Sequence, residues 1–337
     1  MPFDASLGAL RRLAFVRALP LACLLCHCGL PVHQGQSPAE RSSPALLVLP
    51  DDGTAALLAA VRGARRRVWG ELYMLTSFDA MDALIAARAG GADVRMLLEP
   101  APYGSEAANQ DAFQTLGAAG LDVRWFAVPG GLVHAKFLLI DDTAWILTLN
   151  LTQSGLTRNR EYAVADRDPR DVGRLEGLWR SDAIGAPPGT GADGAAIVAS
   201  PVDARPRLTA MLEAARTSVA IEVEELSDAD FVARLSAAGA RGVALTIVVP
   251  ASDRSAATSA AVARLAAAGI PVRALAAPTL HAKAMVVDGQ VTYLGSVNFT
   301  RASFDDNREV GLLTRDAAIT ARVAATLATD WAAAAPP

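Results

Sequence analysis

The chain contains the stretch VHAKFLLIDDTAWILTLNLTQSGLTRNREYAV at residues 133–164 and a second version, LHAKAMVVDGQVTYLGSVNFTRASFDDNREVGL, at residues 280–312. His134 and His281 lie 147 positions apart, whereas the matching Asn and Glu residues lie 148 apart. A hairpin turn that is one residue longer in the second copy explains the difference. The chain is therefore built on an internal duplication.

The duplication extends upstream of both copies. Helix and strand patterns alternate over residues 54–66, 67–74, 80–89 and 93–98, and again over residues 206–216, 218–224, 228–238 and 243–249. This alternation predicts an α/β fold in which helices cover the sheets. We expect two homologous α/β lobes, related by a pseudo-twofold axis, with the functional site at their interface.

The boundaries follow from composition. We predict an export signal at residues 1–30, a disordered tether at 31–44, an N-terminal lobe at 45–184, a Gly/Pro-rich linker at 185–195 and a C-terminal lobe at 196–335. Residues 1–30 combine three arginines with an apolar stretch, which is typical of secreted or periplasmic proteins. Acylation at Cys23, giving a lipoprotein anchor, is an alternative, and so is a start codon assigned too far upstream of a cytoplasmic enzyme.

Composition excludes several classes of protein. With 52% hydrophobic residues and a net charge of −4, the chain is neither disordered nor fibrous. All three cysteines lie in the leader, so the exported chain would have no disulfide and no thiol nucleophile. The acidic balance disfavours nucleic acid as a partner without excluding it.

Lysine and histidine are placed selectively. Among 31 basic residues the lysines are Lys136 and Lys283 alone, and each stands two residues after a repeated histidine. Outside the first 33 residues, His134 and His281 are the histidines of the chain. On a strand, residues i and i+2 point to the same face, so each motif presents an imidazole and an ammonium together.

This set suits phosphoryl transfer. Lys and Asn side chains from two lobes can surround the oxygens of a phosphodiester, while one histidine attacks phosphorus and the other protonates the leaving oxygen. The candidate catalytic residues are His134, Lys136, His281, Lys283, Asn150, Asn298, Glu161 and Glu309. The sequence offers no convincing metal site, and we expect no cofactor and a metal-independent displacement.

The two copies resemble the duplicated HKD motifs of the phospholipase D superfamily. The second copy matches that pattern fully, through His281, Lys283, Asp288, Ser296 and Asn298. The first copy departs from it, because Thr148 takes the position of Ser296 and Leu147 that of Gly295.

The resemblance implies a covalent phosphohistidine that water or an alcohol resolves. It implies His134 as the nucleophile and His281 as the general acid, with Glu309 orienting His134 and Glu161 orienting His281 across the lobes. Pairing within each lobe is the alternative. The motif residues Asp141 and Asp288 stand beside turns, and we predict that they brace the structure instead of contacting substrate.

Other polar residues flank these motifs. Arg160 and Arg308 either contact substrate phosphate or face away from the site, as neighbours of inward-facing strand residues do. In the inner strands, Glu71 and Glu222 are followed two residues later by Tyr73 and Glu224. These four lie near the cleft or take paired structural roles.

The predicted export, the acidic mature chain and the absence of a basic aromatic strip favour a phospholipid substrate at a membrane surface, hydrolysed or transferred by a phospholipase D or a cardiolipin-synthase-like enzyme. A secreted nuclease of the same superfamily is the first alternative. A catalytically inactive binding protein is the second. Because one chain supplies both half-sites, we expect a monomer.

Overall fold

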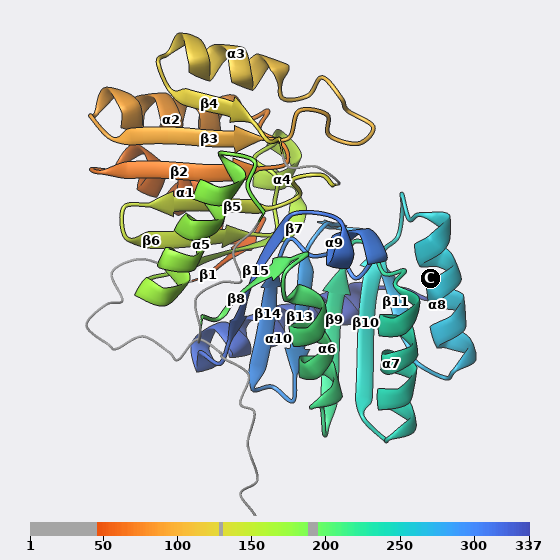
Figure 1. Ribbon diagram of the computed structural model, residues 1–337. Helices are drawn as coiled ribbons and strands as arrows, with labels where there is room; N and C mark the ends of the chain where they lie inside the picture. The colour runs from red at the N-terminus through yellow and green to blue at the C-terminus, as the bar shows by residue number, and fades with distance from the viewer. Residues whose placement is uncertain (1–45, 128–130, 188–194) are drawn as a thin grey trace, which may run out of the picture.

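A computed structural model describes residues 46–127, 131–187 and 195–337. The predicted export signal, the predicted tether and most of the predicted linker lie outside these residues. Figure 1 shows two β-sheets, the N-terminal one in orange to yellow-green above the C-terminal one in green to blue.

The N-terminal sheet has strand order β1-β7-β6-β5-β2-β3-β4. Its strands are β1 (Leu46–Leu49), β2 (Arg67–Leu72), β3 (Asp93–Leu98), β4 (Asp122–Trp125), β5 (Lys136–Ile140), β6 (Thr143–Leu147) and β7 (Asn159–Asp166). Strands β2, β3 and β4 run parallel, and the others pair antiparallel. A short strand from the second half, β12 (Thr279–Leu280), pairs with β7.

The C-terminal sheet repeats this arrangement with strand order β11-β10-β9-β13-β14-β15-β8. Its strands are β8 (Ile197–Ser200), β9 (Ser218–Val223), β10 (Ala244–Pro250), β11 (Val272–Leu275), β13 (Lys283–Val287), β14 (Val291–Gly295) and β15 (Glu309–Thr314). The predicted duplicated α/β fold is confirmed.

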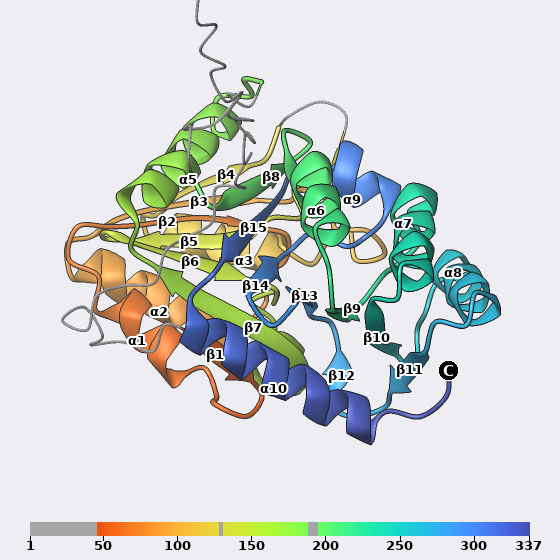
Figure 2. The same ribbon diagram turned by 90° about the horizontal axis from the view of Figure 1, so that it is seen from below.

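The two sheets alternate with three layers of helices, one on the outer face of each sheet and one between the sheets. They are α1 (Ala55–Arg62), α2 (Phe78–Ala89), α3 (Gln110–Ala118), α4 (Gln153–Thr157), α5 (Pro169–Asp182), α6 (Ala204–Glu213), α7 (Ala229–Ala240), α8 (Ala256–Ala267), α9 (Arg301–Asp305) and α10 (Ala317–Ala333). Helices α1–α3 pack on the outer face of the N-terminal sheet and α6–α9 on that of the C-terminal sheet. Helices α5 and α10 lie in the central core with residues of both sheets, and Figure 2 shows α10 alongside β1.

Local chemistry sets the element ends. Ser77, Asp228 and Ser255 each accept a hydrogen bond from a first-turn backbone N–H and begin α2, α7 and α8, of which α2 and α7 start close to the predicted positions. The predicted strand over residues 67–74 ends earlier, at Leu72. The backbone that follows Leu72 bonds to the side chain of Asn109. That side chain donates to the carbonyl of Tyr73 and accepts from the N–H of Leu75.

Two buried ion pairs join the lobes. Arg160 on β7 bonds to Asp330 on α10, with Nε 2.5 Å from Oδ2. Arg308, just before β15, bonds to Asp182 on α5, with Nε 2.6 Å from Oδ2. These contacts agree with the second of the two expected settings, in which the arginines face away from the site, and they add that each guanidinium is buried against a helix of the opposite lobe.

Glu71 and Glu222 belong to the same two clusters. Both are fully buried, and burial together with a neighbouring Asp raises the pKa of each well above its ordinary range. The hydroxyl of Tyr162 donates to Glu222 at 2.9 Å. Their role is therefore the structural one, in the interface between the lobes.

Candidate active site

Each repeated histidine is anchored beside the glutamate of the other lobe. The backbone N–H of His134 donates to the carbonyl of Arg308 at 2.8 Å, and Arg308 directly precedes Glu309. The backbone N–H of His281 lies 3.4 Å from the carbonyl of Arg160, and β12, just before His281, pairs with the start of β7. These backbone contacts between the lobes place each histidine next to the opposite lobe, so each half-site contains residues of both lobes.

The imidazole rings are held by buried carboxylates. Nδ1 of His134 lies 2.9 Å from Oε2 of Glu309, and Nδ1 of His281 lies 2.6 Å from Oε1 of Glu161. Both glutamates are fully buried. The predicted pairing across the lobes is confirmed, and the alternative within each lobe is wrong. Because Nδ1 is engaged, Nε2 is left for reaction in each ring.

The two lysines are buried beside the histidines. Nζ of each donates to the backbone carbonyl of its own histidine at 2.6 Å, Lys136 to His134 and Lys283 to His281. Burial is the main cause that lowers the pKa of Lys136 to about 7, and the charge of Lys283 is the next. The two half-sites therefore interact electrostatically and form one site.

The protonation of His134 is set by opposing effects. Burial lowers its pKa, and the charge of Glu309 opposes this only in part. This environment favours a neutral imidazole at His134.

The two motif asparagines differ in their hydrogen bonding. Asn298 accepts from the backbone N–H of Glu225 at 3.0 Å and donates to Oε2 of Glu224 at 3.2 Å. Oδ1 of Asn150 is buried without a hydrogen-bond partner among the described residues. Asn150 therefore has hydrogen-bonding capacity that its own neighbours do not use.

The departures of the first motif have a structural explanation. A Cβ at Gly295 would lie 2.4 Å from Cα of Gly311 and 2.7 Å from the hydroxyl of Tyr293, so the second copy requires glycine. Leu147 instead packs in the outer core. Thr148 keeps the hydroxyl function and donates to Oε2 of Glu161 at 2.6 Å.

The motif aspartates are braces, as predicted. Their carboxylates accept backbone N–H groups of the turn before the neighbouring strand: Asp141 from Arg65, Arg66 and Arg67, and Asp288 from Arg216, Thr217 and Ser218. Partial burial would raise the pKa of Asp288, but these donors lower it to about 2. Both lie at the ends of β5 and β13 away from the lysines.

Tyr73 and Glu224 line the site and break its pseudo-twofold symmetry. The ring of Tyr73 packs edge-on against His134, with centroids 4.6 Å apart. At the matching place Glu224 forms an ion pair with Lys283, Nζ to Oε2 2.6 Å. The sequence left open whether Tyr73 and Glu224 lie near the cleft or take paired structural roles, and both lie beside the repeated histidines. Their position two residues beyond Glu71 and Glu222, on the same face of the strand, was the sequence feature that indicated this.

The sequence matches the family described as "Cardiolipin synthase, PLD-like domain" over residues 57–181 and 208–331. The chain belongs to this family. The two matched segments correspond to the two copies of the duplication, so each supplies one half of the PLD-like site.

Part of the chain is also similar to a curated protein. The chain is 29% identical over 124 residues to cardiolipin synthase A of Pseudomonas aeruginosa (strain LESB58), a match that covers 36% of this chain and 25% of that protein. The match thus spans a quarter of the relative's length.

Two solved structures share the fold. Polyphosphate kinase from Porphyromonas gingivalis has a TM-score of 0.68 at 15% identity, over 88% of this chain and 50% of that one. Phosphatidylserine synthase of Haemophilus influenzae Rd KW20 has a TM-score of 0.63 at 12% identity, over 84% and 86% of the two chains. At these identities the likeness concerns the fold alone.

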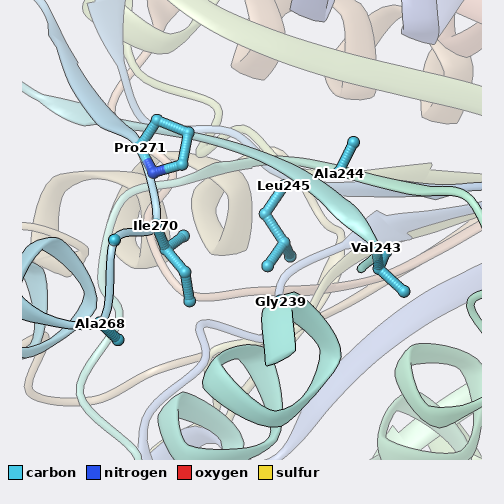
Figure 3. A pocket seen from close by; sticks show the side chains of 8 residues that line it. Gly239, Val243, Ala244, Leu245, Ala268, Ile270 and Pro271 are labelled. Carbon is cyan, nitrogen blue, oxygen red and sulfur yellow. The ribbon is translucent and has the colours of Figure 1, made fainter. Parts of the chain in front are cut away.

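A small apolar pocket lies elsewhere on this PLD-like chain. It measures about 320 Å³ and is formed by residues such as Val243, Leu245 and Ile270 between α7 and the start of β10 (Figure 3). The strand register places it at the end of the sheet opposite Lys283. Within residues 46–127, 131–187 and 195–337, no cluster of metal-ligating side chains occurs, and no helix is long and apolar enough to span a membrane.

Proposed function

We propose that this protein is a phosphodiesterase of the phospholipase D type that hydrolyses or transfers the phosphatidyl group of phospholipids through a covalent phosphohistidine. The observation that carries the proposal is the pair of histidines, each held at Nδ1 by a buried glutamate of the other lobe. Beside them lie two buried lysines, which can neutralise the oxygens of a phosphodiester.

In the first step, Nε2 of His134 attacks phosphorus and the bond from phosphorus to the headgroup oxygen breaks. His281 gives its Nε2 proton to that oxygen, so the headgroup leaves as an alcohol. The surroundings of the rings support these roles. Burial favours the neutral imidazole that a nucleophile needs at His134, and Nε2 of His281 lies on the side of its ring that faces Glu224, 3.6 Å from Oε2.

In the second step, water or an alcohol attacks phosphorus and the bond to Nε2 of His134 breaks. His281, now neutral, takes the proton of the attacking group, which restores the starting state. Water gives hydrolysis and a lipid alcohol gives phosphatidyl transfer. Lys136 and Asn150 would hold the non-bridging oxygens during both steps.

Two exposed aromatic residues support a lipid surface as the place of action. Phe78 is 79% exposed and Tyr103 is 88% exposed. Phe78 begins α2 just after β2, and the backbone N–H of Tyr103 donates to the hydroxyl of Tyr73, whose ring packs against His134. Aromatic side chains at the rim of a site suit the interface of a bilayer. The basic and apolar leader supports an extracytoplasmic location.

The test is headgroup release from vesicles of phosphatidylcholine and phosphatidylglycerol in excess chelator. We expect release by the wild type and by Gln290→Ala, which alters an exposed turn residue of the second copy. His281→Ala should reduce release by at least about a hundred-fold, the scale of general acid catalysis.

Other outcomes would select the alternatives. Nicking of plasmid DNA in chelator, lost in His281→Ala and without any release from vesicles, would favour the nuclease. If His134→Ala and His281→Ala changed no activity on either substrate, the inactive binding protein would be favoured.

A further inference from the structure

One oxygen of Glu224 lies close to three nitrogens of the C-terminal half-site. Oε2 lies 2.6 Å from Nζ of Lys283, 3.2 Å from Nδ2 of Asn298 and 3.6 Å from Nε2 of His281. These three nitrogens are the donors that the C-terminal half-site offers to phosphate. The carboxylate side chain is 32% exposed, so it is set at the open side of the site.

The N-terminal half-site has no such carboxylate. Strand register aligns the two halves: Lys136 pairs with Leu72 and Lys283 with Val223, so the next residues, Tyr73 and Glu224, correspond. The hydroxyl of Tyr73 accepts from a backbone N–H. No carboxylate of the described residues forms an ion pair with Lys136, whose Nζ donates to the backbone carbonyl of His134 and lies 5.1 Å from the centroid of the neutral Tyr73 ring.

Glu224 is ionised in this setting. Burial would raise its pKa, but the charges of His281 and Lys283 and the hydrogen bond from Lys283 outweigh it and lower the pKa far below the ordinary range. A fixed negative charge therefore stands among groups that must bind an anion. Its repulsion of a bound phosphate grows with the charge of that phosphate.

We propose that Glu224 is a specificity-determining residue that makes the site select a phosphodiester monoanion over a phosphate monoester dianion. The inference rests on the proposed function and deepens it. A diester brings one negative charge, which the N-terminal half-site can neutralise. A monoester brings two, and the second meets Glu224. When water completes the reaction the product is a monoester, so the same charge promotes its release.

The test measures dissociation constants by calorimetry at pH 7, where Lys136 still carries part of its charge, with phenyl phosphate as the dianion and diethyl phosphate as the monoanion. Glu224→Gln keeps the shape of the side chain and removes its charge. We expect the preference for diethyl phosphate over the dianion, given by the ratio of the two dissociation constants, to fall about ten-fold. Removing the negative charge of Glu224 improves the binding free energy of the dianion by twice as much as that of the monoanion.

Glu225→Gln is the matched control, since its carboxylate accepts from Ser255 at 3.1 Å instead of from the lysine. It should leave the ratio unchanged. An unchanged ratio in Glu224→Gln, an equal change in Glu225→Gln, or binding of neither probe by any of the proteins would overturn the proposal. Binding needs no turnover, so a changed ratio without headgroup release would refute the lipid function and leave the role of Glu224 standing.

Discussion

Arg308 and Asp182 form an ion pair in the interface between the lobes, and both side chains are almost fully buried, at 2% and 0% exposed. The guanidinium also donates to the backbone carbonyl of Ser200 at 2.6 Å. Glu309, the carboxylate partner of His134, directly follows Arg308. The ion pair between Arg308 and Asp182 therefore fixes the backbone next to Glu309. Arg160 and Asp330 repeat the arrangement on the other side of the pseudo-twofold axis.

Replacing Arg308 with Met should lower the free energy of unfolding by about 3–5 kcal/mol, because Asp182 is left buried without a cation. Urea denaturation near neutral pH measures it. Arg66→Met is the control, since Arg66 pairs with Asp142 on the exposed surface and its loss should not change stability measurably. Equal stability of the two variants would show that the buried pair contributes nothing.

These ion pairs also mark what the sequence could not predict. The repeat, the alternation of elements and the clustering of histidine, lysine and glutamate followed from spacing and resemblance. The partners of Arg160 and Arg308 are 170 and 126 positions away, and no local pattern links such distant residues. For the same reason the sequence left open whether Glu224 lies near the cleft or takes a paired structural role, since strand alternation gives the face on which a residue lies but not its partner.

Glu71 should make stability depend on pH. Burial first, and then the charge of Asp182, raise its pKa above the ordinary value of 4.5. A raised pKa gives stability that is fully present below 4.5 and is lost as the pH rises toward the value in the folded protein. Glu71→Gln removes this loss, so its melting temperature relative to wild type should increase between pH 5 and pH 9.

Glu176→Gln provides the opposite trend as a control. Partial burial would raise the pKa of Glu176, but its hydrogen bonds from Arg67 and Arg180 lower it. Its stabilisation is therefore present at neutral pH and lost in acid. Parallel melting curves for wild type and Glu71→Gln at all pH values would show that Glu71 exchanges no proton on unfolding.

Lys136 should limit anion binding at alkaline pH. Burial and the charge of Lys283 lower its pKa to about 7, so its positive charge is lost above that pH. The affinity for diethyl phosphate should fall about ten-fold between pH 6 and pH 9, as expected when a charge contact to phosphate is lost. Lys136→Met should bind weakly throughout and show a smaller fall.

Lys283→Met separates this effect from a general loss of charge. Removing the like charge should raise the pKa of Lys136, so the fall in affinity should move to higher pH. A fall at the same pH in Lys136→Met as in wild type would assign the titration to another group.

Phe78 and Tyr103 should matter for lipid in a bilayer and not for the chemistry at phosphorus. The double variant Phe78→Ser and Tyr103→Ser removes two large exposed side chains, and burial of one such ring in a membrane interface is worth about 1–2 kcal/mol. Headgroup release from vesicles should therefore fall at least about ten-fold, through weaker binding to the vesicles in a sedimentation assay. Hydrolysis of a soluble diester, bis(p-nitrophenyl) phosphate, should be unchanged.

Ile184→Ser is the control, because Ile184 is 78% exposed but lies beyond the end of α5. If the double variant lost both activities equally, the two aromatic residues would support the site itself and not its contact with a lipid surface.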